Sequence, residues 1–267
     1  MANPLLNDRS WNKAAKDPGW AAPDPSDRHT PITDGPISPW RGNVMTVGGT
    51  ISATGVLMVL LLATAVVGWQ MGPDTSAAYR GFPALALGGM LVGFACLIAM
   101  YFKPMWAKFL APVYALGEGF FLGVISKAYN NVQHGIVVQA VGATLGVFAV
   151  MLVLYRTKII KVTDKFRKIV ITATMGLMLF YLVSFVINLF GGGVSFLQST
   201  SLLSIGFSVF AAGLAAMNLA IDFDFIERGA KQGLPKGMEW FAATALIVTL
   251  VWLYLELLRL LSKLQRR

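Results

Sequence analysis

Residues 238–261 read MEWFAATALIVTLVWLYLELLRLL, a stretch long and apolar enough to cross a lipid bilayer as one helix. Comparable apolar runs recur along the 267-residue chain, which is 56% hydrophobic and only 13% charged. Ordinary soluble domains carry about 25% charged residues. Recurrent runs of this length are typical of membrane-spanning helices and not of a soluble core. We therefore predict an all-α, polytopic membrane protein.

Outward from that stretch, breaks in the apolar pattern delimit six further helices. We place the seven spans at about residues 44–69, 81–102, 107–126, 135–155, 167–190, 200–224 and 238–261. Gly and Pro at the joints, as in Gly72-Pro73, favour departure from helical geometry. Residues 1–43 contain no apolar segment, which predicts a disordered cytoplasmic N-terminal tail and no cleaved secretory signal. The predicted transmembrane domain is then 44–267.

The distribution of basic residues predicts the orientation. The tail and the loops on its side hold 16 Lys or Arg, and the opposite side holds 6. The positive-inside rule therefore places the N-terminus in the cytoplasm and the basic C-terminal end outside. If the last helix returned or the third did not span, the C-terminus would be cytoplasmic. The net charge of +9 follows from this topology and indicates no nucleic-acid partner.

Small residues at helical spacing predict close helix contacts, because helices in lipid associate through such residues. Ala212, Ala216 and Ala220 recur every four residues in the sixth span, and Gly142 and Gly146 do so in the fourth. We expect both sets to lie at helix interfaces.

Acids within or at the ends of the apolar stretches are the candidate functional residues: Glu118, Asp222, Asp224, Glu239 and Glu256. A charge at the bilayer centre costs about 2.5–3.5 kcal/mol on insertion scales, and no Lys or Arg lies in the middle of these stretches. Such carboxyls also titrate nearer physiological pH when desolvated and clustered. The pattern predicts proton or cation handling through a pH-dependent latch.

Each acid also has a structural interpretation. Asp222 and Asp224 fall at the predicted C-terminal end of the sixth helix, where the macrodipole disfavours negative charge, so they need cationic partners, an ion or protonation. Asp224 can instead lie at the water interface beside Arg228. Glu118 has glycine on both sides, which lets another helix approach its carboxyl group. An interhelical hydrogen bond is the alternative role for it.

The last helix carries the other two acids. Glu239 lies at its N-terminus, where an acid is favourable without any further role. Glu256 can pair with Arg259, three residues on, as an ordinary helix neighbour. The chain has only two histidines, His29 and His134, and no P-loop, so zinc-protease, serine-protease and ATP-driven chemistry are not expected. We expect neither an enzyme nor a bound cofactor.

Motifs in the last third resemble those of the Bax inhibitor family, and most closely its bacterial branch from actinobacteria. These motifs are NLAIDFDFIER (218–228), GLPKGMEW (233–240) and VTLVWLYLELLR (248–259), together with PVYALGEG (112–119). The resemblance covers about residues 44–267. It implies a seven-helix bundle whose last helix is surrounded by the other six.

The resemblance also implies a pH-sensitive cation leak, mainly of calcium, gated by an aspartate pair between the sixth and seventh helices. Asp222 matches the first aspartate, although Phe223-Asp224 replaces the residues that commonly follow it. Tyr254-Leu255-Glu256 matches the second by motif, whereas counting back from Leu258-Arg259 places that position near Thr249. Both assignments stay open at this point.

The expected function is a pH-sensitive calcium leak channel or exchanger of the bacterial plasma membrane, with Ca²⁺ or H⁺ as cargo. Asp222 would contact calcium transiently, with Asp224, Glu118 and Glu256 as its candidate partners in gating and pH sensing. Carboxylate and carbonyl oxygens suit calcium. Expected partners are the lipid bilayer, cations and a membrane protein. The alternative is a non-conducting interaction protein that modulates a membrane protease or a stress response, and a weaker third option is a proton-coupled transporter.

Overall fold

The computed structural model describes residues 44–72, 84–190 and 199–266. The tail predicted to be disordered, 1–43, lies outside the described residues. The described elements are α2 (Val47–Met71), α3 (Ala84–Phe102), the short 3-10 helix η5 (Pro104–Trp106), α4 (Ala107–Val132), α5 (Ile136–Arg156), α6 (Asp164–Leu189), α8 (Leu202–Lys231) and α9 (Met238–Gln265).

The predicted all-α membrane fold is confirmed. Each of the seven predicted spans corresponds to one α-helix, and in the described residues six of these are long and apolar enough to cross a membrane. The remaining one, α3, is apolar but shorter over the described residues. The chain is a multi-pass membrane protein.

The end of the sixth span was predicted wrongly. The structure continues this helix to Lys231, seven residues beyond the predicted end at 224. Asp222 and Asp224 therefore lie inside α8 and not at its C-terminus. The last turn instead carries Arg228 and Lys231, the charge sign that the helix macrodipole favours there.

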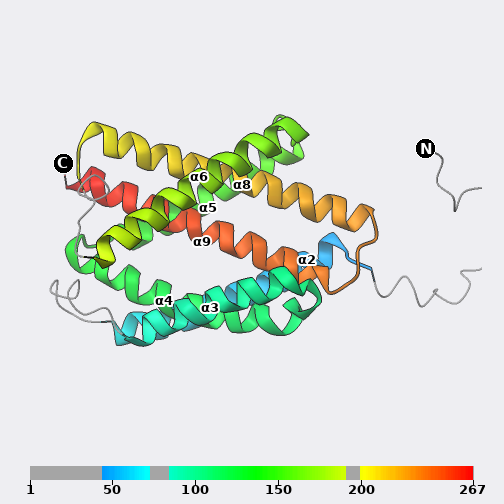
Figure 1. Cartoon of the computed structure of the whole chain (residues 1–267), viewed down its shortest axis with the longest axis horizontal. Coiled ribbons are helices and arrows are strands. Elements are labelled where there is room, and N and C mark those ends of the chain that lie inside the picture. Colours follow the sequence, from blue (N-terminus) through cyan, green and yellow to red (C-terminus); the bar gives the residue numbers. More distant parts are fainter. Residues whose placement is uncertain (1–43, 73–83, 191–198, 267) are drawn as a thin grey trace, which may run out of the picture. The chain divides into compact units, whose positions relative to one another are not determined.

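The last helix, α9, runs through the middle of the bundle (Figure 1), with α2, α3 and α4 on one side and α5, α6 and α8 on the other. It contacts α2, α4, α5 and α8 directly. One buried apolar cluster joins α9 to α5 and α8, and a second joins it to α2, α3 and α4. Since both clusters share α9, this helix forms the core, and the predicted central position is confirmed.

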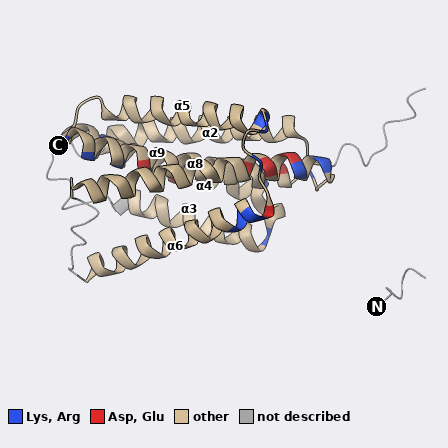
Figure 2. Cartoon of the chain, turned by 90° about the horizontal axis from the view of Figure 1, so that it is seen from above, with Lys and Arg blue, Asp and Glu red and all other residues tan. Residues whose placement is uncertain are grey.

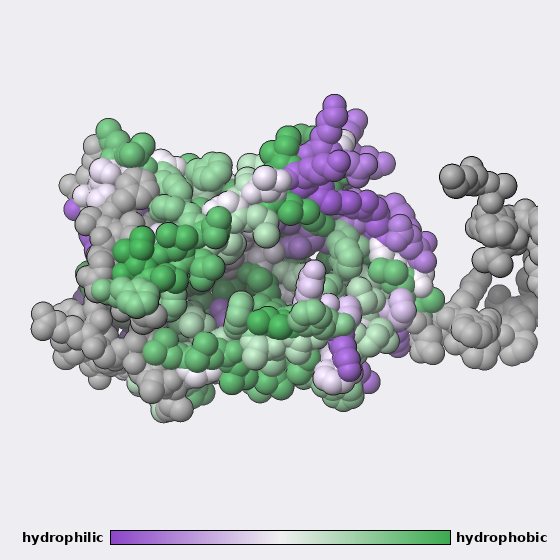
Figure 3. Space-filling view, in the orientation of Figure 1, coloured by the Kyte–Doolittle hydropathy of each residue, from purple (hydrophilic) through white to green (hydrophobic). Residues whose placement is uncertain are grey.

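The outer surface of these helices is apolar. Large side chains such as Val59, Phe109 and Leu203 are exposed, and Figure 3 shows broad hydrophobic areas along the bundle with hydrophilic side chains gathered toward one end. Most described Lys and Arg residues lie at the end where α2, α4, α6 and α9 begin (Figure 2). A soluble monomer rarely exposes so much contiguous apolar surface, whereas a lipid-facing one does.

The helix-contact prediction is half right. Ala212 and Ala220 are buried, as expected. Gly142 and Gly146 face open space, since a Cβ built on either would meet nothing within 4 Å. Among the described glycines, the closest approach of two helix backbones is between α2 and α4, where a Cβ on Gly123 would overlap the carbonyl oxygen of Ala65.

Candidate functional site

A cavity of about 280 Å³ lies where α3, α8 and α9 meet, and Asp222 lines it. The other lining residues are mostly apolar: Leu97, Met100, Tyr101, Phe241, Thr244, Ala245, Val248 and Thr249. Asp222 is half-buried as a residue, but its Oδ2 is buried and has no hydrogen-bond partner among the residues that the structure describes. Buried polar atoms are nearly always paired, so this oxygen requires an explanation.

The structure distinguishes the two open choices for the partner of Asp222 on the last helix. The Thr249 hydroxyl, which donates to the Ala245 carbonyl at 3.2 Å, lies within hydrogen-bonding reach of the Asp222 carboxyl group. Glu256 lies two helical turns further along α9 and contacts other residues. The position near Thr249 is therefore the spatial partner, and this pair consists of one carboxylate and one hydroxyl where the resemblance implied two aspartates.

Asp224 points away from this cavity. Its Oδ2 accepts a hydrogen bond from Arg167 of α6 at 2.7 Å and also pairs with Arg228 one turn on. The expectation of a position beside Arg228 is correct, and Arg167 is an additional partner 57 residues earlier in the chain. Asp222 and Asp224 thus do not form a pair.

Glu118 lies between α3 and α4. Its Oε2 is 3.4 Å from the position that a Cβ on Gly93 would take, and its neighbour Tyr114 is buried beside it. Gly93 is one turn before Leu97, which lines the Asp222 cavity. The two acids therefore border the same helix, although Glu118 itself does not line the cavity. Its flanking glycines do allow close helix approach, since Gly117 contacts Gly89 of α3.

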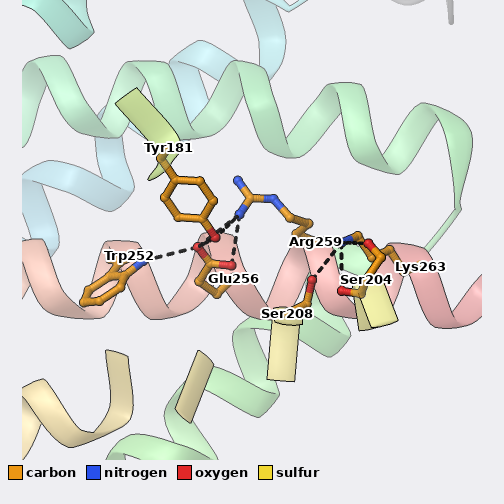
Figure 4. Close-up of polar contacts among 7 residues, drawn as sticks. All are labelled: Tyr181, Ser204, Ser208, Trp252, Glu256, Arg259 and Lys263. Atoms are coloured by element: carbon orange, nitrogen blue, oxygen red, sulfur yellow. Dashed lines mark hydrogen bonds and ion pairs between the residues drawn. The ribbon is translucent and has the colours of Figure 1, made fainter. Parts of the chain in front are cut away.

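Glu256 is the centre of a buried polar cluster (Figure 4) and is only 1% exposed. It accepts hydrogen bonds from Tyr181 of α6 at 2.8 Å and Trp252 at 3.2 Å, and Arg259 contacts both of its oxygens at 3.0 Å. Arg259 also donates to the Tyr181 hydroxyl at 2.9 Å. The interpretation of Glu256 as the ion-pair partner of Arg259 is the one that the geometry shows.

Sequence reasoning missed Lys263, which extends the same face of α9. Its ammonium is buried and donates to the Ser204 carbonyl, the Ser204 hydroxyl and the Ser208 hydroxyl of α8 (Figure 4). The sequence predicts only that Lys263 belongs to the basic C-terminal end outside the membrane. The spacing of these residues could have indicated that Lys263 is buried, because it follows Glu256 by two helical turns and lies on the same face of the helix.

Glu239 connects two helix N-termini. It lies in the first turn of α9, as expected, and its Oε1 accepts hydrogen bonds from the Thr46 backbone N–H and hydroxyl, both at 2.9 Å. Thr46 is the N-cap of α2. Gly49 leaves room for the carboxyl group, since a Cβ there would overlap it. Glu239 is thus a structural link between α2 and α9.

We expect Glu239→Gln to lower the free energy of unfolding by about 1–2 kcal/mol, because a charged acceptor of two hydrogen bonds at a helix N-terminus is replaced by a neutral one. Unfolding in mixed micelles, followed by tryptophan fluorescence, measures this. The matched control is Asp164→Asn, an acid that also lies in the first turn of a helix but has a 90% exposed side chain, 4.0 Å from Arg167, so its contribution is small. Equal losses in the two variants would contradict the link.

The Asp222 cavity has too few oxygen ligands to bind a metal ion tightly. Within the described ranges, no group of three or more His, Cys, Asp or Glu residues can hold a metal ion. Calcium commonly takes six to eight oxygens, whereas the side chains that line this cavity offer one carboxylate and the hydroxyls of Tyr101, Thr244 and Thr249. A cation in this cavity would keep much of its water.

The comparisons with known proteins decide the family. A family model described as Bax inhibitor 1 like matches residues 3–266. The chain belongs to the Bax inhibitor 1 like family. The match begins at residue 3, so the family relation extends into the tail that the sequence resemblance, over about 44–267, had left out. Searches found no matching curated protein and no matching solved structure.

Proposed function

We propose that this member of the Bax inhibitor 1 like family is a pH-sensitive cation leak channel or exchanger, with calcium as its main cargo. The observation that carries the proposal is Asp222, whose side chain lines a 280 Å³ cavity and whose buried Oδ2 has no partner among the described residues. An acid left unpaired inside a membrane protein is by default a candidate for ion or proton handling.

The roles of the four candidate acids differ in this proposal. Asp222 makes the transient contact with the cation, and Thr249 lines the same cavity. Glu118, which borders the same helix α3, is the auxiliary acid. Asp224 and Glu256 are occupied by arginines, so they hold the bundle together and do not contact the cargo.

The pH dependence follows from the charge on Asp222. The ionised carboxylate attracts a cation into the cavity, and the protonated acid does not. Flux should therefore rise with pH. The proposed setting is a bacterial plasma membrane with a cytoplasmic N-terminus, which the excess of Lys and Arg at that end of the bundle supports.

The test is calcium flux into liposomes that contain the purified protein and a calcium-sensitive dye. We expect Asp222→Asn to reduce flux and to remove its rise between mildly acid and alkaline pH, because the amide cannot ionise. Asp224→Asn is the matched control, since this acid lies two residues away and faces Arg167. It should keep the pH profile of the wild-type protein.

Two results would overturn the proposal. Flux that depends on pH equally in wild type and Asp222→Asn would remove Asp222 from the pathway. Absence of flux in the wild-type protein at every pH would favour the non-conducting alternative, a protein that modulates a membrane protease or stress response.

A further inference from the structure

A second cavity, of about 330 Å³, lies at the basic end of the bundle, and Asp222 is not among its lining residues. Arg167 of α6 and Arg228 of α8 line it together with Gln232 and Gly229. Its remaining walls are apolar: Ile221, Phe225 and Leu234. The cavity thus combines two guanidinium groups with a hydrophobic wall.

The charges around this cavity do not balance. Arg167 and Arg228 converge on a single oxygen, Asp224 Oδ2. Asp164 is 4.0 Å from Arg167, but its side chain is 90% exposed, so water screens it. The nearest other acid, Glu227, pairs with Lys231 and accepts from Tyr155. One guanidinium charge is therefore left over at the cavity.

The exposed charges nearby add little to this potential. Lys165 and Lys168 lie in the first turns of α6, but both are exposed, so water screens them as it screens Asp164. The start of α6 also contributes the positive end of its helix dipole, although the end of α8 contributes a negative one. Figure 2 shows the basic residues gathered at this end of the helices. An anion is the ligand that this field favours.

The position and lining of the cavity identify the class of anion. It lies at the ends of membrane-spanning helices, the level at which lipid headgroups occur, and basic pockets between helices are known to hold them. The arginines match a phosphate, which guanidinium groups bind with two parallel hydrogen bonds. The apolar wall matches the glycerol and the first methylenes of an acyl chain.

We propose that this cavity binds the phosphate headgroup of an anionic membrane phospholipid. Asp224 acts as a positioning residue: it holds the two guanidinium groups together in the absence of lipid and competes with the phosphate for them. The site is independent of the proposed ion leak, because neither Arg167 nor Arg228 lines the Asp222 cavity.

The test measures lipid binding to the full chain in nanodiscs of phosphatidylcholine, with and without phosphatidylglycerol, by native mass spectrometry. We expect retention of phosphatidylglycerol over phosphatidylcholine, and a reduction of about fivefold in Arg228→Gln, as for loss of one basic residue near a membrane surface. Asp224→Asn should increase retention, because both arginines are then released to the phosphate. A variant that loses the structure of the cavity would retain less lipid at this site, so an increase distinguishes release of the arginines from local unfolding.

The controls separate this site from general charge effects and from a free anion. Arg266→Gln, an exposed basic residue at the opposite end of α9, should leave retention unchanged. Inorganic phosphate should not displace the lipid, because it cannot fill the apolar wall. The proposal is overturned if Arg228→Gln and Arg266→Gln behave alike, if Asp224→Asn weakens retention, or if inorganic phosphate displaces the lipid completely.

Discussion

Glu256→Ala is expected to lower the free energy of unfolding by about 3 kcal/mol, the low end of the range for breaking a buried ion pair from one side. The alanine removes the acceptor of Tyr181 and Trp252 and leaves the Arg259 charge without its carboxylate. The low end is appropriate because the Arg259 side chain is 32% exposed and can recover some hydration. Unfolding in mixed micelles, followed by circular dichroism, measures the loss.

A double-mutant cycle separates the ion pair from simple loss of packing. Arg259→Leu together with Glu256→Leu should recover much of the stability, since replacing both members of a buried pair by apolar residues is often close to neutral. Glu256→Gln keeps the shape and should cost less than Glu256→Ala. If the double variant is as unstable as the sum of the single ones, Glu256 and Arg259 do not act as a pair.

The pairing of Glu256 was partly visible in the sequence, and that of Asp224 was not. Arg259 is three residues from Glu256, so helical geometry alone suggests the contact. Arg167 is 57 residues from Asp224, and Tyr181 is 75 from Glu256. Those contacts depend on which helices lie next to each other, and one sequence contains no information on that. The reasoning that found no central cations therefore overestimated how many acids are unpaired.

Helix positions were predictable because a bilayer imposes a minimum apolar length, but some helix ends were not. The apolar pattern in the sixth span stops near residue 224, whereas α8 continues to Lys231. The extra turns are held by pairs of polar side chains one turn apart, as between Glu227 and Lys231. Hydropathy indicates where a helix leaves the lipid, but it does not indicate how far the helix continues in water.

Hydropathy also could not predict whether a small residue faces lipid or a neighbouring helix. In a soluble helix the polar side identifies the outer face, but a lipid-facing helix is apolar all round. Hydropathy alone therefore does not distinguish Gly142 and Gly146, which lie in an apolar stretch, from Gly119 and Gly123, which also do. Only the latter pair contacts another backbone.

Gly123→Leu should consequently be among the most destabilising single substitutions in the described helices, with a loss of about 3 kcal/mol or more. A Cβ at this position would overlap the Ala65 carbonyl oxygen and lie 2.8 Å from the Trp69 backbone nitrogen. Backbone atoms cannot move aside by changing rotamer, so α2 itself would have to shift. Overpacking that can relax through side chains costs only about 1–3 kcal/mol.

The matched control is Gly142→Leu in α5, because a Cβ there meets nothing within 4 Å and the new side chain would point outward. We expect no loss in this control and a small gain, since glycine inside a helix costs about 0.5–1 kcal/mol relative to alanine. Thermal unfolding in detergent compares the two variants directly. Gly119 of α4 also packs against α2, at Leu61, so we expect Gly119→Leu to destabilise the protein as Gly123→Leu does. Equal stability of the Gly123 and Gly142 variants would mean that α2 and α4 do not lie in backbone contact.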